Sequence, residues 1–242
     1  MHTEHPAAKT PGDDVVIWRY MTVEKYLSLL TTSKLFLCRL DNFEDPWEGA
    51  WPKAFLQGLL NELKKDGVDG GNLQSAHKKW LFVSCWHANE YESAAMWDLY
   101  STKSSGVAVR TTVGALKKSV ISSQNYTIGQ VDYLDVESDP RSLEFNMLVP
   151  AFLKRMSFKH ENEVRLVRFD LGTTVNENGE NRIGDPSPIL DLEVDLNELL
   201  VDVYFSPTMP RWLVDSIVAV SKRFGLSGDR YTQSKLYDNY IL

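Results

Sequence analysis

Four short runs of β-branched and aromatic residues constrain the fold of this chain more than any other feature. They read VVIWRYM from Val15, WLFVSCW from Trp80, GVAVRTT from Gly106 and EVRLVRF from Glu163. Such runs, bounded by polar segments, predict buried strands. Helical patterns separate them at unequal intervals, without a regular strand-helix-strand repeat. We therefore expect an α+β domain with a mixed or antiparallel central sheet and flanking helices.

The remaining segments give further predictions of secondary structure. Apolar spacing predicts helices at 23–30, 54–65, 92–101, 113–123 and 211–225, and a long helix at 142–158 that Pro150 kinks or breaks. Further strands are expected at 35–40, 128–135, 200–207 and 235–242, and a polar loop or hairpin at 173–188.

Composition bounds the class of protein. The chain has 242 residues, 43% of them hydrophobic, and a formal net charge of −7. These values exclude collagen-like and low-complexity chains and are typical of a globular domain with a sizeable core. Net acidity disfavours duplex nucleic acid bound over a broad face, although a local basic groove stays open. We expect one domain over residues 15–242, preceded by a flexible lead-in at 1–14.

Several absences narrow the expected chemistry and location. The two cysteines, Cys38 and Cys85, lie in apolar runs and read as buried free thiols, so we assign no metal ligands to them. No window approaches the about 20 apolar residues of a membrane helix, and the N-terminus has no apolar signal region. We expect a cytoplasmic protein without a membrane partner. Rossmann, Walker, zincin and α/β-hydrolase signatures are missing.

The acidic turn NFEDPWEG, at residues 42–49, is the first cluster of candidate site residues. It holds Glu44, Asp45 and Glu48 within five residues. Three carboxylates this close favour a divalent metal or a raised pKa. The simpler explanation, which we prefer, is that Asn42 or Asp45 hydrogen-bonds the backbone of the turn.

The second cluster follows the strand that begins at Trp80. Ser84 and His87 lie at its end, where a sheet commonly presents site residues. Trp86, Trp97 and Tyr100 are candidates for a wall that stacks on a planar ligand, although an aromatic seam of the core is the preferred interpretation. Three-residue spacing places Ser84 and His87 on opposite faces, which disfavours a nucleophile-base pair.

The third cluster is RMSFKHENEVRLV, at residues 155–167. Glu161 and Glu163 alternate with one residue between them, so both side chains point the same way from a strand. A neighbouring arginine keeps a carboxylate ionised. A surface ion-pair network is the alternative, but the charge is dense beside a strand that enters the core, which favours function. The surrounding cations are Arg155, Lys159, His160 and Arg165.

In this order the motifs resemble a bacterial family known as domain-of-unknown-function family 2971. The resemblance covers roughly residues 18–225 and implies no reaction. The motifs that carry it are NFEDPWE at 42–48, SCWH at 84–87, MWDLYS at 96–101, GVAVRT at 106–111, KHENEVRLV at 159–167 and YFSPTMP at 204–210.

A second resemblance is to the ADP-ribosyltransferase fold, whose enzymes carry an Arg, a Ser and a Glu on successive strands. Arg19, Ser84 and Glu163 occupy comparable places. The resemblance implies that Arg19 holds the phosphates of NAD, Ser84 positions the nicotinamide ribose and Glu163 stabilises the oxocarbenium-like charge. It further implies that Trp97 or Tyr100 stacks on nicotinamide. The alternative for Arg19 is an ion pair with Asp41.

Three functional hypotheses follow. The first is an NAD-using ADP-ribosyltransferase or NAD glycohydrolase, acting as a toxin or phage-defence effector. The second is a metal-dependent nuclease or phosphodiesterase, with ligands among Asp45, Glu48, Glu161 and Glu163, and Lys159 near the phosphate. The third is a non-enzymatic ligand-binding or regulatory module, with its carboxylates paired and no accessible pocket.

The first hypothesis assigns most of the candidate residues. NAD is then a substrate, a protein or nucleic acid is its acceptor, and Glu163→Gln abolishes activity while folding stays nearly intact. The oligomeric state is left open. The assigned residues are Glu163, Ser84 and Arg19 as catalytic, Arg19, Trp97, Tyr100 and His87 as NAD-binding, and Asp45, Glu48 and Arg165 as substrate-binding.

Overall fold

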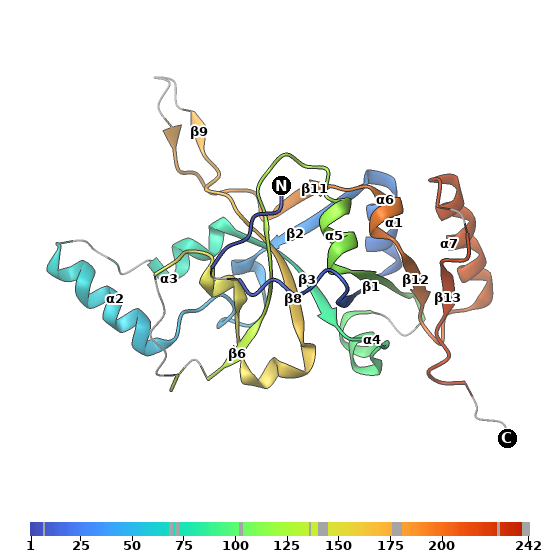
Figure 1. The fold of residues 1–242 in the computed structure, drawn as a ribbon, viewed down its shortest axis with the longest axis horizontal. Helices are drawn as coiled ribbons and strands as arrows, with labels where there is room; N and C mark the ends of the chain where they lie inside the picture. The colour runs from blue at the N-terminus through green and yellow to red at the C-terminus, as the bar shows by residue number, and fades with distance from the viewer. Residues whose placement is uncertain are drawn as a thin grey trace.

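A nine-stranded, mostly antiparallel sheet organises the described part of the chain (Figure 1). The computed structural model describes residues 1–6, 8–67, 70, 73–101, 104–135, 137–139, 145–175, 181–226 and 228–238. The strands of the sheet are β1 (Val16–Thr22), β2 (Lys34–Arg39), β3 (Leu81–Ala88), β4 (Gly106–Thr112), β5 (Thr127–Gln130), β8 (Glu163–Phe169), β11 (Ile189–Glu193), β12 (Asp202–Phe205) and β13 (Tyr231–Gln233).

Helices and two small strand pairs surround this sheet, which gives the α+β arrangement expected from the sequence. The α-helices are α1 (Val23–Thr32), α2 (Lys53–Lys65), α3 (Leu73–Ala76), α4 (Ala94–Tyr100), α5 (Val113–Ser119), α6 (Leu196–Leu199) and α7 (Arg211–Arg223). The 3-10 helices are η1 (Leu40–Asn42), η2 (His77–Trp80), η3 (Val149–Phe152) and η4 (Met156–Glu161). The small pairs are β6 (Asp132–Leu134) with β7 (Leu153–Arg155), and β9 (Thr174–Val175) with β10 (Asn181–Arg182).

Two strands, β2 and β1, share one side of β3, each pairing with a different end of it. The first half of β3 pairs with β2, with Cys38 opposite Val83, and its last residues pair with β1, with Trp18 opposite His87. The other side of β3 pairs with β8 over its whole length. Because β1 and β2 join the same side of β3 at opposite ends, the middle of β3 faces an opening between them.

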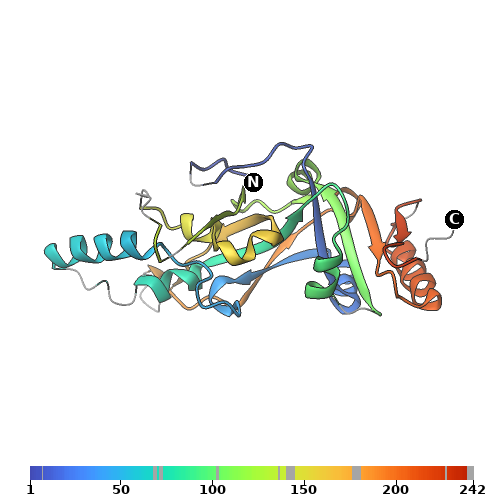
Figure 2. The ribbon, with the colours of Figure 1, turned by 90° about the horizontal axis from the view of Figure 1, so that it is seen from below.

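The main core lies between one face of the sheet and four helices. Tyr26 and Leu30 of α1, Leu116 of α5 and Ile217 of α7 are buried there against the strands. A smaller cluster on the other face is covered by α4 and includes Trp97. Figures 1 and 2 show α2 projecting from the end of the molecule opposite α7. None of the described helices is long and apolar enough to cross a membrane.

The four runs of β-branched and aromatic residues form β1, β3, β4 and β8, as predicted. Alternating or continuous apolar residues place them in the sheet interior, where their side chains are mostly buried. Helix α1 begins where expected and extends two residues further, to Thr32, where Ser33 caps it with a left-handed backbone, φ 52°.

The long helix expected at 142–158 is wrong over the described residues. Residues 145–148 are irregular, and the segment then forms η3, β7 and η4 in turn. Pro150 lies in η3, where it needs no backbone donor, and the parallel pairing of β7 with β6 satisfies the next backbone groups. Residues 142–144 lie outside the described residues.

Three further expectations concern the C-terminal strand, the N-terminal lead-in and the polar hairpin. The terminal strand expected at 235–242 is wrong at 235–238, because the strand is β13 and a turn follows it; residues 239–242 are outside the described part. The described residues of the expected lead-in, 1–6 and 8–14, contact the domain: Thr3 N donates to Tyr126 O, and Gln130 N donates to Lys9 O. The hairpin at 173–188 contains β9 and β10, with 176–180 outside the described residues.

Candidate functional site

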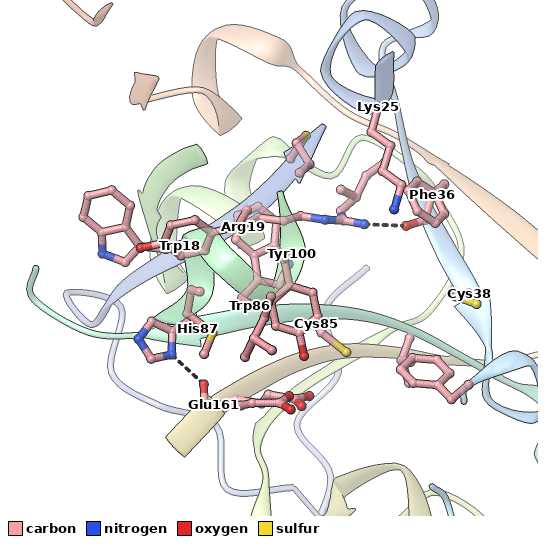
Figure 3. Close-up of a pocket in the computed structure, with 18 of the residues that line it drawn as sticks. Trp18, Arg19, Lys25, Phe36, Cys38, Cys85, Trp86, His87, Tyr100 and Glu161 are labelled. Atoms are coloured by element: carbon pink, nitrogen blue, oxygen red, sulfur yellow. Dashed lines mark hydrogen bonds between the residues drawn. The ribbon is translucent and has the colours of Figure 1, made fainter. Parts of the chain in front are cut away.

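A cavity of about 970 Å³ opens where β1 and β2 separate along β3. Its walls come from β1, α1, β2, β3, α4, the acidic turn and the β7-η4 segment. A cavity of this size is in the range that holds small ligands and cofactors. Figure 3 shows Arg19 and Phe36 on one side and Glu161 on the other. Among the residues that the NAD hypothesis assigns, Ser84, Trp97 and Arg165 are not part of the cavity lining, and those that line it are Arg19, Asp45, Glu48, His87, Tyr100 and Glu163.

Arg19 lies in this cavity, and no carboxylate in the described part of the chain pairs with it. Its Nη1 donates to Ser84 Oγ at 2.6 Å and its Nη2 donates to the main-chain oxygen of Phe36 at 3.2 Å. The guanidinium carbon is 5.0 Å from the centroid of the Phe36 ring and 5.6 Å from that of Trp86. Burial lowers the pKa of Arg19 to about 10, so the group stays charged near neutral pH. Asp41 instead binds Arg39.

Ser84 on β3 orients the guanidinium of Arg19 by a hydrogen bond. Its hydroxyl accepts the Arg19 bond and a second bond from Trp86 Nε1 at 3.1 Å. The side chain is buried and is not among the residues that line the cavity. Ser84 and Arg19 therefore come together as predicted for the Arg-Ser pair, but the direct contact of Ser84 with a ligand stays a prediction.

A buried network of five charged side chains forms the opposite side of the cavity. Lys154 Nζ is 2.6 Å from Glu161 Oε2, contacts Glu163 Oε1 and is 3.7 Å from Glu48 Oε2. Arg165 Nε is 2.6 Å from Glu163 Oε2, and Arg165 Nη2 is 2.6 Å from Glu48 Oε1. That last contact is an ion pair by distance, although its N–H direction does not make a hydrogen bond.

This network holds three carboxyl groups against two cations, with every side chain at most 6% exposed. Burial and the hydrogen bond and charge of Glu163 raise the pKa of Glu161 to about 7. Burial also opposes the charge of Glu163, but Arg165, Glu161 and Lys154 hold the pKa of Glu163 far below its ordinary value. Glu161 is therefore the carboxyl that exchanges a proton near neutral pH.

Tyr100 and His87 border the carboxyl pair. The Tyr100 hydroxyl hydrogen-bonds to the Glu161 carboxylate, and burial together with that negative charge raises the pKa of Tyr100. His87 Nδ1 donates to the main-chain oxygen of Glu161 at 2.5 Å, which fixes the position of the glutamate backbone (Figure 3). Both side chains line the cavity, as their assignment to ligand binding requires.

Trp97 lies in the core and not in the cavity wall. Its ring packs edge-on against Tyr20, with centroids 5.0 Å apart, and its Nε1 donates to Glu92 Oε2 at 3.0 Å. The indole is 3% exposed. Trp97 therefore belongs to the aromatic seam of the core that the sequence interpretation preferred, because α4 turns Trp97 inward and Tyr100 toward the cavity, and its stacking on a ligand stays a prediction.

The acidic turn contributes two carboxylates that already have partners. Asp45 accepts two hydrogen bonds from Arg155, at 2.8 and 3.1 Å, and one from the main-chain N of Trp47. Glu48 belongs to the buried network. Turn chemistry therefore accounts for Asp45, as preferred from the sequence. Across the described residues, no three His, Cys, Asp or Glu side chains are grouped so as to hold a metal ion.

The register of β3 and β8 explains how both halves of the site reach one cavity. His87 lies opposite Glu163 and Cys85 opposite Arg165, so these four side chains share a face. Ser84 points to the other face. Arg19 and Glu163 thus belong to opposite faces of the sheet, and the opening between β1 and β2 joins them.

Lys154 is the site residue that sequence reasoning missed. It was hidden within the expected long helix, and its sequence context carries no local signal for a buried cation. Glu161 was singled out with Glu163 by their alternation, but the stronger role went to Glu163. Which of the two glutamates is protonated depends on how β7, η4 and β8 pack against one another, and only the structure shows that packing.

No family model matches this chain, and neither a curated protein nor a solved structure shows significant similarity to it. The resemblances to domain-of-unknown-function family 2971 and to the ADP-ribosyltransferase fold therefore stay predictions from the motifs.

Proposed function

We propose that this protein binds NAD in the cavity and cleaves the bond between nicotinamide and ribose, as a glycohydrolase or an ADP-ribosyltransferase. One observation carries the proposal: a single cavity contains a charged Arg19, which no carboxylate of the described residues pairs with, and a pair of buried carboxyl groups, Glu161 and Glu163. The first is suited to a phosphate and the second to a sugar that develops positive charge.

Arg19 supplies the phosphate end. A half-buried guanidinium for which the described residues supply no counter-charge attracts an anion, and its planar N–H groups match phosphate oxygens. The bonds to Ser84 and Phe36 fix its orientation before the ligand arrives, which lowers the entropic cost of binding. The rings of Phe36 and Trp86 pack beside the guanidinium.

The carboxyl pair supplies the reacting end. When the C–N bond breaks, its electron pair leaves with nicotinamide, which departs neutral, and positive charge develops on the ribose carbon. The permanently charged Glu163 stabilises that charge. A water molecule or an acceptor hydroxyl then bonds to the carbon, and the ionised Glu161 accepts its proton.

The rate is expected to rise with pH through about 7. Glu161 must be ionised to accept a proton, and its pKa of about 7 makes the active fraction grow from about one tenth at pH 6 to about nine tenths at pH 8. Initial rates of nicotinamide release between pH 5.5 and 9 measure this. A rate that falls across that interval would contradict the base role.

Arg19→Met is expected to reduce kcat/KM for NAD by about 10- to 100-fold, because a charge-assisted bond to phosphate is lost. Arg19→Lys keeps the charge and should recover part of the loss. The matched control is Arg223→Met on the exposed side of α7, which removes the same charge outside the cavity. Equal losses in the Arg19→Met and control variants would exclude a specific phosphate site.

The proposal is tested by incubating the purified chain with NAD and separating nicotinamide and ADP-ribose by chromatography. A parallel sample contains a chelator. Release that the chelator does not change supports the proposal. Release abolished by the chelator favours the metal-dependent alternative, which the pairing of Glu48, Glu161 and Glu163 with Lys154 and Arg165 makes less suited to this site.

A further inference from the structure

The ammonium of Lys154 is the central contact of the carboxyl pair. It donates to Glu161 Oε2 at 2.6 Å and to Glu163 Oε1, and it lies 3.7 Å from Glu48 Oε2. The ring of Phe158 covers it, with 4.8 Å from Nζ to the centroid. The side chain is 6% exposed, so little solvent screens these contacts.

The two carboxyl groups receive unequal support from this geometry. Glu163 contacts both cations, Lys154 and Arg165, and each of its oxygens accepts a hydrogen bond. Among the cations of the described residues, Glu161 contacts Lys154 alone, and its other hydrogen-bond partners are Glu163 and the neutral hydroxyl of Tyr100. Negative charge is therefore more stable on Glu163, and the proton belongs to Glu161.

We propose that Lys154 is the positioning residue of this pair: its shared ammonium keeps Glu163 ionised and sets the pH at which Glu161 releases its proton. The inference rests on the proposed function for its meaning in catalysis. The titration of Glu161 can be measured directly, so its test needs no substrate.

Several charged and titratable groups face Glu161, Glu163 or Lys154, and Lys154 is distinguished from the other groups by its contact with both carboxyls of the pair. Without it, three carboxyl groups face Arg165 alone, and Glu161 should ionise at higher pH. Removal of the Glu48 charge has the opposite effect, because it leaves two cations for two carboxyls. The facing groups are Glu163 and Arg165 from β8, Lys154 from β7, Tyr100 from α4, His87 and Cys85 from β3, Tyr133 from β6, and Glu48 from the acidic turn.

The experiment is a ¹³C NMR titration of the full chain labelled at the side-chain carboxyl of glutamate, from pH 5 to 9. The Glu161 signal is assigned by its loss in Glu161→Gln. Lys154→Met should move its midpoint upward by about one pH unit or more, and Glu48→Gln should move it downward. Lys154→Arg, which keeps the charge, should stay nearer to the wild type. If Lys154→Met has no cooperative thermal transition, Lys154→Gln takes its place.

An unchanged Glu161 midpoint in the Lys154→Met or Lys154→Gln chain overturns the inference, and so does a wild-type Glu161 that is fully ionised at pH 5. Opposite shifts in the Lys154 and Glu48 variants support it. Shifted titrations without NAD cleavage leave the role of Lys154 standing and remove the proposed function. NAD cleavage with unshifted Glu161 titrations removes the role of Lys154 and leaves the proposed function standing.

Discussion

Arg165→Met is expected to lower the free energy of unfolding by about 3–5 kcal/mol, because it leaves buried charges without their partner. Arg165 is 0% exposed and binds Glu163, Glu48 and the main-chain oxygen of Ala151. Methionine fills part of the space but satisfies none of these groups. Urea denaturation followed by circular dichroism measures the loss.

The matched control is Arg110→Met on β4. Arg110 pairs with Asp202 at 2.7 Å, but both side chains are about a third exposed, so solvent screens the pair. Its loss should cost less than about 1 kcal/mol. Combining Arg165→Met with Glu163→Gln should recover part of the lost stability, because fewer carboxylates are then left unpaired. An Arg165→Met chain as stable as the Arg110→Met control would contradict this view of the network.

The same contacts revise an expectation from the sequence. Glu163→Gln was expected to leave folding nearly intact, but the structure places Glu163 between Lys154 and Arg165. Its removal leaves both buried cations with fewer partners, so a loss of stability accompanies any loss of activity. Glu161 is the better residue with which to separate the two effects.

Glu161→Gln is expected to reduce the rate of nicotinamide release by about 10²- to 10⁴-fold, the usual contribution of a general base. Glutamine has nearly the shape of the protonated carboxyl and cannot accept the proton. Chromatographic rates at pH 8 measure the loss, with Glu90→Gln at an exposed position as the matched control. A loss below about tenfold would remove Glu161 from the chemistry.

Glu161→Gln should lower the reaction rate, but it should make the stability of the folded chain less sensitive to a rise in pH. The folded chain raises the pKa of Glu161 from its ordinary 4.5 to about 7, so it favours the protonated form. Wild-type stability from this group is therefore present below about pH 4.5 and is lost as pH rises through 7. The Gln variant lacks that loss, and its thermal midpoint should fall less than that of the wild type between pH 5 and 8.

Most strands of the sheet can be predicted from the sequence, but the pairing of β1 and β2 with the same side of β3 cannot. The apolar runs of β1, β3, β4 and β8 each have enough β-branched residues to predict a strand. That β1 and β2 share one side of β3 depends on contacts between distant segments, which local patterns do not contain. Over the described residues 145–158 the predicted helix is wrong for a related reason, because the pairing of β7 with β6 replaces the helix that the apolar spacing indicates.

The candidate site, too, could be predicted from the sequence only in part. The order of Arg19, Ser84 and Glu163 along the strands placed them near one another, and the structure brings Arg19 and Ser84 into contact. Burial could not be predicted, because Lys154 and Arg165 are residue types that usually face solvent. Which of two alternating glutamates carries a proton depends on those two cations.

The most direct test of the proposed function compares nicotinamide release from NAD by the wild type and by Glu161→Gln at pH 8. We expect steady release by the wild type, unaffected by chelator, and release at least about 100-fold slower from a variant that folds equally well. No release by the wild type, or equal rates from both chains, would contradict the assignment of this cavity to NAD cleavage.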